Sequence, residues 1–139
     1  MKIEKYMNLA KSLAEVSEFR RQKLGCVVTY KKNVIGTGVN SYKTHPIQKE
    51  FNKLRYSEDS TPHCLHAEMT ALIPLHNMDI DWNRVNLFVY RIKKDSPTKM
   101  GLARPCSGCM GFIKSLGIKD IYYSSEDGYV HEVLDIDND

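Results

Sequence analysis

The chain has 139 residues, of which 42% are hydrophobic and 27% are charged, and its formal net charge is +3. This length allows one hydrophobic core but not two, so we expect a single domain over residues 1–139. The small net charge does not demand a polyanionic partner, although it suits a substrate that carries a phosphate group.

The sequence contains no stretch that approaches the run of about 20 apolar residues needed to cross a bilayer. Its first 16 residues, MKIEKYMNLAKSLAEV, alternate apolar and charged residues and include acids, unlike a signal peptide. We therefore expect a cytoplasmic protein without a membrane partner.

The first half of the chain predicts a helix followed by a hairpin. Residues 4–17 place apolar side chains at helical spacing, and this helix would end near Phe19. Two β-rich runs, 25–30 and 34–39, are joined by the short polar turn 31–33 and predict two antiparallel strands. Residues 40–64 then form a long polar connection, which we expect to border a functional site.

The second half alternates between the two kinds of element. A helix is predicted over residues 65–73, ending near Pro74, and a buried strand over 85–92. A basic loop at 93–104 precedes a helix over 106–116, for which Gly117 is a natural left-handed C-cap. A strand at 118–123 follows, and Asp127-Gly128 predicts an antiparallel hairpin at the end of the chain. This alternation indicates an α/β fold.

Potential metal ligands stand at the start of two predicted helices. His66 begins one of them, and Cys106 and Cys109 begin the other. Residues at i and i+3 share a helix face, so both thiolates can reach one ion, and the helix dipole favours thiolates at that end. One imidazole and two thiolates provide three protein ligands for a tetrahedral Zn²⁺ and leave the fourth position to water, as in a catalytic site. Two thiolates reduce the acidifying effect of the ion on water, so the neighbouring carboxylate of Glu68 becomes useful.

The order His66-Ala67-Glu68 followed by Pro105-Cys106-Ser107-Gly108-Cys109 matches the signature of zinc-dependent nucleobase deaminases. From about Leu24 to Tyr123 the chain resembles the cytidine and deoxycytidylate deaminase superfamily. The resemblance implies a three-layer α/β/α sandwich with a mixed five-stranded sheet, one catalytic zinc ion and a homo-oligomer.

The resemblance also implies roles for individual residues. Glu68 would be catalytic, taking a proton from water at the metal and delivering protons to the ring nitrogen and the leaving amine. The hairpin that ends at Asn40 looks like the first hairpin of deoxycytidylate deaminases and bacterial tRNA adenosine deaminases, which implies that Asn40 contacts the substrate sugar. The backbone of Ala67 would help to read the base edge. Ser41 replaces a glycine that is usual in allosterically regulated deoxycytidylate deaminases, so regulation by nucleoside triphosphates is not expected.

The implied activity is hydrolytic deamination of cytosine to uracil in a nucleoside or nucleotide such as dCMP, with release of ammonia. A polynucleotide deaminase acting on tRNA or single-stranded DNA is the alternative, because the lysine-rich loops would also suit nucleic acid. A third possibility is a binding module that keeps the zinc fold, although such a module would not need Glu68. The antiparallel ending is more typical of free-cytidine and toxin-type deaminases.

Other interpretations of the same residues remain open at this stage. His66 could cap a helix, Glu68 could be a first-turn acid, and the cysteine pair could be a redox pair. Asn40 could simply cap a turn. A second, structural zinc is not expected, because the spacing of the remaining candidates matches no ligand motif: these are Cys26, His45, His63 and Cys64. The basic residues of the two loops could form a phosphate rim or a solvated face.

Overall fold

The computed structural model describes residues 3–18, 22–41, 46–47, 66–93 and 100–135. Its helices are α1 (Ile3–Glu15), α3 (Ala67–Leu72) and α4 (Ser107–Leu116), with short 3-10 helices at Ile73–Leu75 and Trp82–Arg84. Its strands are β1 (Lys23–Tyr30), β2 (Asn33–Val39), β3 (Val85–Ile92), β4 (Met100–Gly101), β5 (Asp120–Ser125) and β6 (Gly128–Val133).

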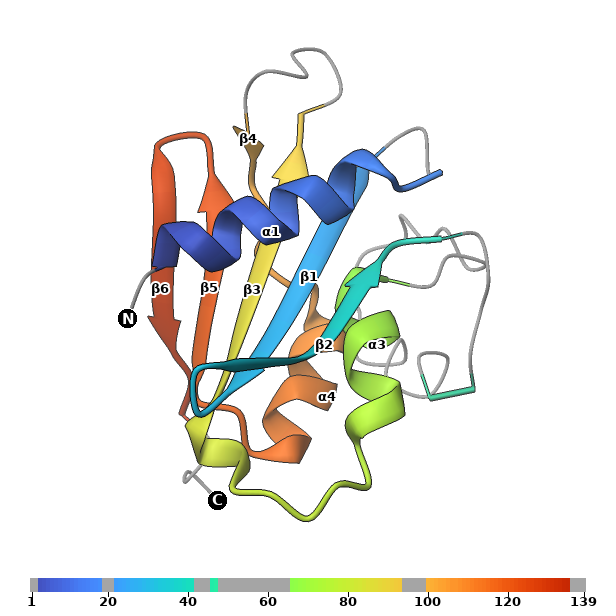
Figure 1. The fold of residues 1–139 in the computed structure, drawn as a ribbon, viewed down its shortest axis with the longest axis vertical. Helices are drawn as coiled ribbons and strands as arrows, with labels where there is room; N and C mark the ends of the chain where they lie inside the picture. The colour runs from blue at the N-terminus through green and yellow to red at the C-terminus, as the bar shows by residue number, and fades with distance from the viewer. Residues whose placement is uncertain (1–2, 19–21, 42–45, 48–65, 94–99, 136–139) are drawn as a thin grey trace.

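The described strands form one mixed sheet (Figure 1). Five of them lie in the order β2-β1-β3-β5-β6, and the short β4 pairs with β3. Only the β3–β5 pairing is parallel, and β5 and β6 form the expected antiparallel hairpin. The prediction of a mixed sheet is therefore confirmed. The sixth strand was missed because two residues inside a basic loop carry no periodic pattern.

Helices cover both faces of the sheet, which confirms the three-layer arrangement. Met7, Ala10 and Ala14 of α1 are fully buried in a cluster with Val27 and Phe88 on one face. The alternate residues of the same strands pack on the other face with α3 and α4: these are Cys26, Val28, Leu87 and Val89. Figure 1 shows α1 crossing in front of the strands.

The ends of two predicted elements shift for local reasons. The helix predicted over 65–73 is α-helical only over residues 67–72, and Pro74 lies in the 3-10 turn that follows. The strand predicted at 118–123 runs from 120 to 125, because the amide of Ile118 still bonds to Ile113 of α4. Gly117 has a φ of 103° and caps α4 as predicted. Phe19, where the first helix was expected to end, lies outside the described residues.

Both hairpin turns differ in detail from their sequence patterns. Lys31 and Lys32 form the first turn with positive φ angles of 52° and 69°, which lysine seldom adopts. In the second hairpin Ser125 pairs with Gly128, so Glu126 and Asp127 make the turn and Gly128 opens β6. None of the helices in the described residues is long and apolar enough to cross a membrane.

Candidate metal and catalytic site

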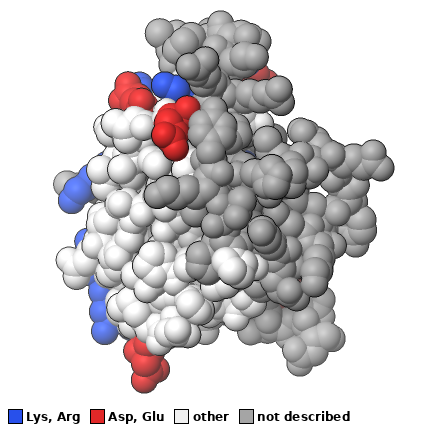
Figure 2. Space-filling view, turned by 90° about the vertical axis from the view of Figure 1, so that its right-hand side faces the viewer, with Lys and Arg blue, Asp and Glu red and all other residues white. Residues whose placement is uncertain are grey.

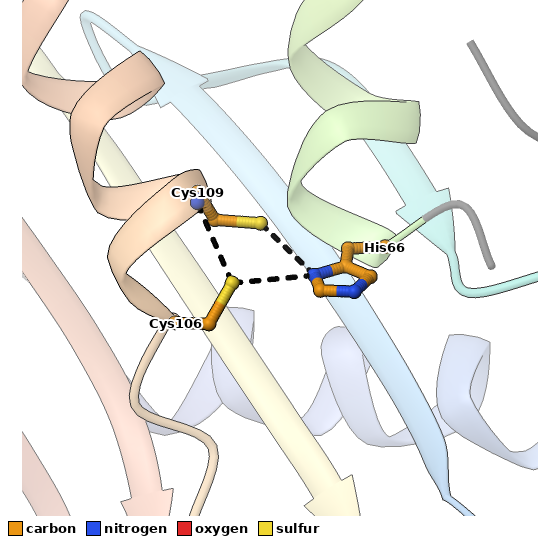
Figure 3. A group of neighbouring side chains, drawn as sticks. All are labelled: His66, Cys106 and Cys109. Carbon is orange, nitrogen blue, oxygen red and sulfur yellow. Dashed lines mark hydrogen bonds between the residues drawn. The ribbon is translucent and has the colours of Figure 1, made fainter. Parts of the chain in front are cut away.

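The N-termini of α3 and α4 meet on one side of the sheet, and each provides candidate ligands. His66 is the N-cap of α3, and Cys106 is the N-cap of α4, both with extended backbone. Cys109 lies one turn into α4, on the same side as Cys106. Figure 3 shows the two sulfur atoms and the imidazole pointing toward one another from the two helices.

The distances within this group fit a metal ion. Nδ1 of His66 lies 3.1 Å from Sγ of Cys109 and 3.6 Å from Sγ of Cys106. Usual zinc–nitrogen and zinc–sulfur bond lengths at a tetrahedral angle give an N–S separation of about 3.6 Å. One ligand atom from each residue lies within 4.8 Å of the others. The donor set therefore fits one zinc ion and leaves a coordination position for water.

The surroundings of Cys106 favour its thiolate, the form that binds a metal ion. Hydrogen bonding with Cys109, together with hydrogen bonding to His66, outweighs burial and lowers the pKa of Cys106 to about 3. The amide of Cys109 also donates to Sγ of Cys106 at 3.5 Å, as the open end of a helix favours. Cys106 and Cys109 form no disulfide.

Glu68 lies in the first turn of α3 and is only 4% exposed. Burial raises the pKa of its carboxyl group; the neighbouring His66 opposes this shift, and Cys106 adds to it. Glu68 in turn adds to the effect of burial in raising the pKa of Cys26 on β1. The carboxyl group is therefore largely removed from bulk water and interacts electrostatically with His66 and Cys106. A buried carboxyl group with a raised pKa is suited to accept and return a proton.

Ala67 and Asn40 occupy different kinds of position. Ala67 is fully buried as the first residue of α3, so its N–H has no acceptor within the helix. Asn40 is 2% exposed; its Oδ1 accepts from Ser17 Oγ at 2.6 Å and from the Leu24 amide at 3.0 Å. Its Nδ2 donates to the Gln22 carbonyl at 2.6 Å. Asn40 therefore joins Ser17, just after the end of α1, to the start of the hairpin.

Of the residues considered for a second zinc, the structure describes Cys26. Cys26 is fully buried in the apolar cluster beneath α3 and α4. His45, His63 and Cys64 lie outside the described residues. Among the described residues, His66, Cys106 and Cys109 are the one group with metal-binding geometry.

Two of the basic residues that could have formed a phosphate rim instead form ion pairs with glutamate side chains. Arg104 donates from Nε and Nη2 to both carboxylate oxygens of Glu132 at 2.9 Å, and Tyr123 donates to the same carboxylate at 3.0 Å. Lys93 forms an ion pair with Glu126. No local sequence pattern predicts these pairs, because the partners are 28 and 33 residues apart. Figure 2 shows that the described surface visible from this side is mostly uncharged, with charged residues near its margins.

Arg91 was also missed. It is the penultimate residue of β3, and its Nη1 donates to the Leu102 carbonyl at 3.4 Å. Its buried Nε has no hydrogen-bond partner among the described residues, and none of the ion pairs within them includes Arg91. A strand-end arginine gives no sequence signal beyond its charge.

Known structures share this fold. The dCMP deaminase of cyanophage S-TIM5 without ligand is 24% identical, with a TM-score of 0.61, over 88% of this chain and 82% of that chain. Its complex with dCMP and dUMP gives 25% identity and a TM-score of 0.60, over 88% and 79% of the two chains. A cytidine deaminase from Burkholderia pseudomallei is 16% identical, with a TM-score of 0.64, over 96% and 93%.

Among curated protein sequences, none matches the chain significantly. A family model described as the cytidine and deoxycytidylate deaminase zinc-binding region, however, matches residues 1–125. This match spans all of the candidate site residues, from Asn40 to Cys109. The chain belongs to the cytidine and deoxycytidylate deaminase family.

Proposed function

We propose that this protein is a zinc-dependent deaminase that hydrolyses the exocyclic amine of cytosine in a nucleoside or nucleotide, with dCMP as the leading substrate. The observation that carries the proposal is the group of His66, Cys106 and Cys109 beside the buried carboxyl group of Glu68. Three protein ligands are typical of a catalytic rather than a structural zinc site.

The proposed reaction replaces an amine with a carbonyl oxygen. Cytosine and water give uracil and ammonia, with no redox change. Zinc, when bound by His66, Cys106 and Cys109, would supply Lewis acidity that makes water a better nucleophile. Glu68 accepts the proton that water loses on attack at C4 and delivers it to N3 of the ring. A second proton passes through Glu68 to the departing amine, so the carboxyl group ends in its starting state.

The first turn of α3 supports the positioning of the base. The N–H of Ala67, which lacks an acceptor within the helix, is proposed to donate to the pyrimidine carbonyl. The side-chain amide of Asn40, which has a second Nδ2 hydrogen besides the one bonded to the Gln22 carbonyl, is proposed to bond to a sugar hydroxyl. Because the other polar contacts of Asn40 are made by the protein, the sugar would meet an amide that is already held in place.

A monophosphate substrate also needs a cation, and Arg91 is the proposed contact. After the carboxyl end of β3 the chain continues into α4 and then returns in β5, which runs parallel to β3. Arg91, near the end of β3, and Cys106, at the start of α4, therefore lie toward the same end of the strands. Ligands of open α/β sheets bind at the carboxyl ends of the parallel strands. Arg91 on β3 is also the cross-strand neighbour of Leu24 on β1. The amide of Leu24 donates to the side chain of Asn40. The cyanophage dCMP deaminase, whose structure holds dCMP and dUMP, supports a nucleotide substrate.

The protein is further proposed to act in the cytoplasm as a single domain within a homo-oligomer. A reducing compartment would keep Cys106 and Cys109 as thiolates available to zinc. Sedimentation of the zinc-loaded protein measures the assembly, and a monomer at every concentration would contradict that part of the proposal.

The test is ammonia release together with zinc content. Purified zinc-loaded protein should release ammonia from deoxycytidine or dCMP and contain one zinc ion per chain. The matched variant Glu68→Gln should keep the zinc and lose at least about 100-fold in kcat, the usual contribution of a positioned acid and base. Near-normal turnover by a zinc-loaded Glu68→Gln protein would refute the role of Glu68. Activity on tRNA or single-stranded DNA alone would replace the proposed substrate with a polynucleotide.

A further inference from the structure

The segment before the metal-ligand helix is held to the sheet at two successive residues. The amide of Ala103 donates to the Ser124 carbonyl on β5 at 2.9 Å. The next residue, Arg104, makes the two-point ion pair with Glu132 on β6. Pro105 is buried and follows directly, and Cys106 then caps α4.

The contact between Arg104 and Glu132 is better defined than an ordinary surface pair. The guanidinium uses two nitrogens against two carboxylate oxygens, a geometry that fixes direction as well as distance. Tyr123 donates a third hydrogen bond to the same carboxylate from the neighbouring strand. The Glu132 side chain is 28% exposed and that of Arg104 is 49% exposed, so the contact lies at the margin of the protein.

Little freedom remains between this contact and the first thiolate. Proline fixes its own φ angle and restricts the residue before it, so Arg104 and Pro105 form a stiff connection. A displacement of the Arg104 backbone therefore has few rotations to absorb it before Cys106. The ion pair adds little to folding, since exposed pairs contribute between nothing and about 1 kcal/mol.

We propose that Glu132 is a positioning residue for the metal site, and that the β5–β6 hairpin sets the place of Cys106 through Arg104 and Pro105. The inference rests on the proposed function in one respect, the use of Cys106 as a metal ligand. Glu132 itself touches neither metal nor substrate. Its loss should weaken metal binding while leaving the fold intact.

The test measures metal affinity directly, in competition with a chromophoric chelator, using Zn²⁺ and Co²⁺ in turn. Glu132→Gln should weaken binding of both ions by about 2- to 5-fold, below the effects usual for residues that bond directly to metal ligands, because the partly exposed pair contributes at most about 1 kcal/mol. Arg104→Lys, which keeps the charge but cannot bond at two points, should give a smaller loss. Tyr123→Phe should give the smallest loss, because the ion pair remains.

Glu126→Gln is the matched control. It removes another ion pair of the same hairpin, which joins Glu126 to Lys93 rather than to the residues directly before Cys106. The metal-free forms of Glu132→Gln and Glu126→Gln should unfold at similar temperatures, and only Glu132→Gln should shift the thiolate-to-Co²⁺ absorption band. Equal losses of affinity in both variants, or no loss in Glu132→Gln, would overturn the inference. A wild-type protein that binds neither ion would instead refute the metal site of the proposed function.

Discussion

Gly38 on β2 lies directly beneath Ala67, the first residue of α3. A Cβ atom on Gly38 would come within 2.5 Å of the Ala67 carbonyl oxygen and 2.6 Å of the Ala71 amide nitrogen. Both contacts are with backbone, which cannot rotate away. The absence of a side chain at Gly38 thus allows α3, and with it His66 and Glu68, to lie close on the sheet.

Gly38→Ala should therefore disturb the site as well as the fold. We expect a loss of about 1–3 kcal/mol in the free energy of unfolding, the usual cost of overpacking, and weaker zinc binding because His66 moves with α3. Urea unfolding and chelator competition measure the two effects.

Gly25→Ala is the control for this substitution. Its Cβ would come within 2.0 Å of the Ala10 carbonyl oxygen of α1, on the opposite face of the sheet. It should cost at least as much stability without weakening zinc binding of the folded protein. If both variants bind zinc like the wild type, the close approach of β2 does not set the position of His66.

Asn40→Ala should lower both stability and substrate affinity. Three hydrogen bonds, one buried and two partly buried, are lost, and the Leu24 amide and Ser17 hydroxyl are left without this acceptor, so we expect about 2–3 kcal/mol of destabilisation. Loss of the proposed sugar contact should also raise KM.

Ser17→Ala separates the two effects of Asn40. It removes the hydroxyl that bonds to Asn40 but leaves the Asn40 amide in place. Stability should fall by about 1 kcal/mol with KM unchanged. A KM that rises equally in both variants would mean that Asn40 acts only through the fold.

Arg91→Met should distinguish nucleotide from nucleoside turnover. If Arg91 contacts the phosphate, KM for dCMP should rise at least about 10-fold, because a charge-assisted contact contributes roughly 1.5–3 kcal/mol, while KM for deoxycytidine should not change. Steady-state kinetics with both substrates gives the comparison. Arg84→Met, which removes an exposed arginine paired with Asp81, is the control and should affect neither substrate. Equal effects of Arg91→Met on both substrates would exclude a phosphate contact.

The Arg104–Glu132 pair predicts a small loss of stability in acid. Hydrogen bonding to Arg104, helped by Tyr123 and opposed by burial, lowers the pKa of Glu132 below its ordinary value. A depressed carboxyl pKa stabilises the folded state above the unfolded-state pKa of about 4.3. That stability is lost as the pH falls through the folded-state value.

Denaturant unfolding of the wild type and of Glu132→Gln measures the contribution of the Arg104–Glu132 pair to the free energy of unfolding. The difference in unfolding free energy should stay constant above about pH 5 and shrink below it. Because the pair is partly exposed, the difference should not exceed about 1 kcal/mol and should decrease with added salt. A difference that grows in acid would contradict the assignment.

Much of the fold followed from local patterns. The strand at 85–92 was predicted with its observed ends, and the C-cap at Gly117 was identified, because buried runs and left-handed glycines are signals contained in a few residues. The ends of β5 and the turn at Glu126 and Asp127 were misplaced, because neighbouring hydrogen bonds to α4 and across the hairpin decide them.

The sequence by itself determined the chemistry of the site. The types and spacing of His66, Glu68, Cys106 and Cys109 indicate zinc and a proton carrier, since the cysteines at i and i+3 share a helix face and the order of the four residues matches the deaminase signature. Only the tertiary structure decided which residues surround that chemistry. Asn40 is held by Ser17 and Leu24, Arg104 is neutralised by Glu132, and Gly38 admits α3. These contacts join residues up to 33 positions apart, and no local pattern encodes them, because the packing of the whole chain brings the partners together.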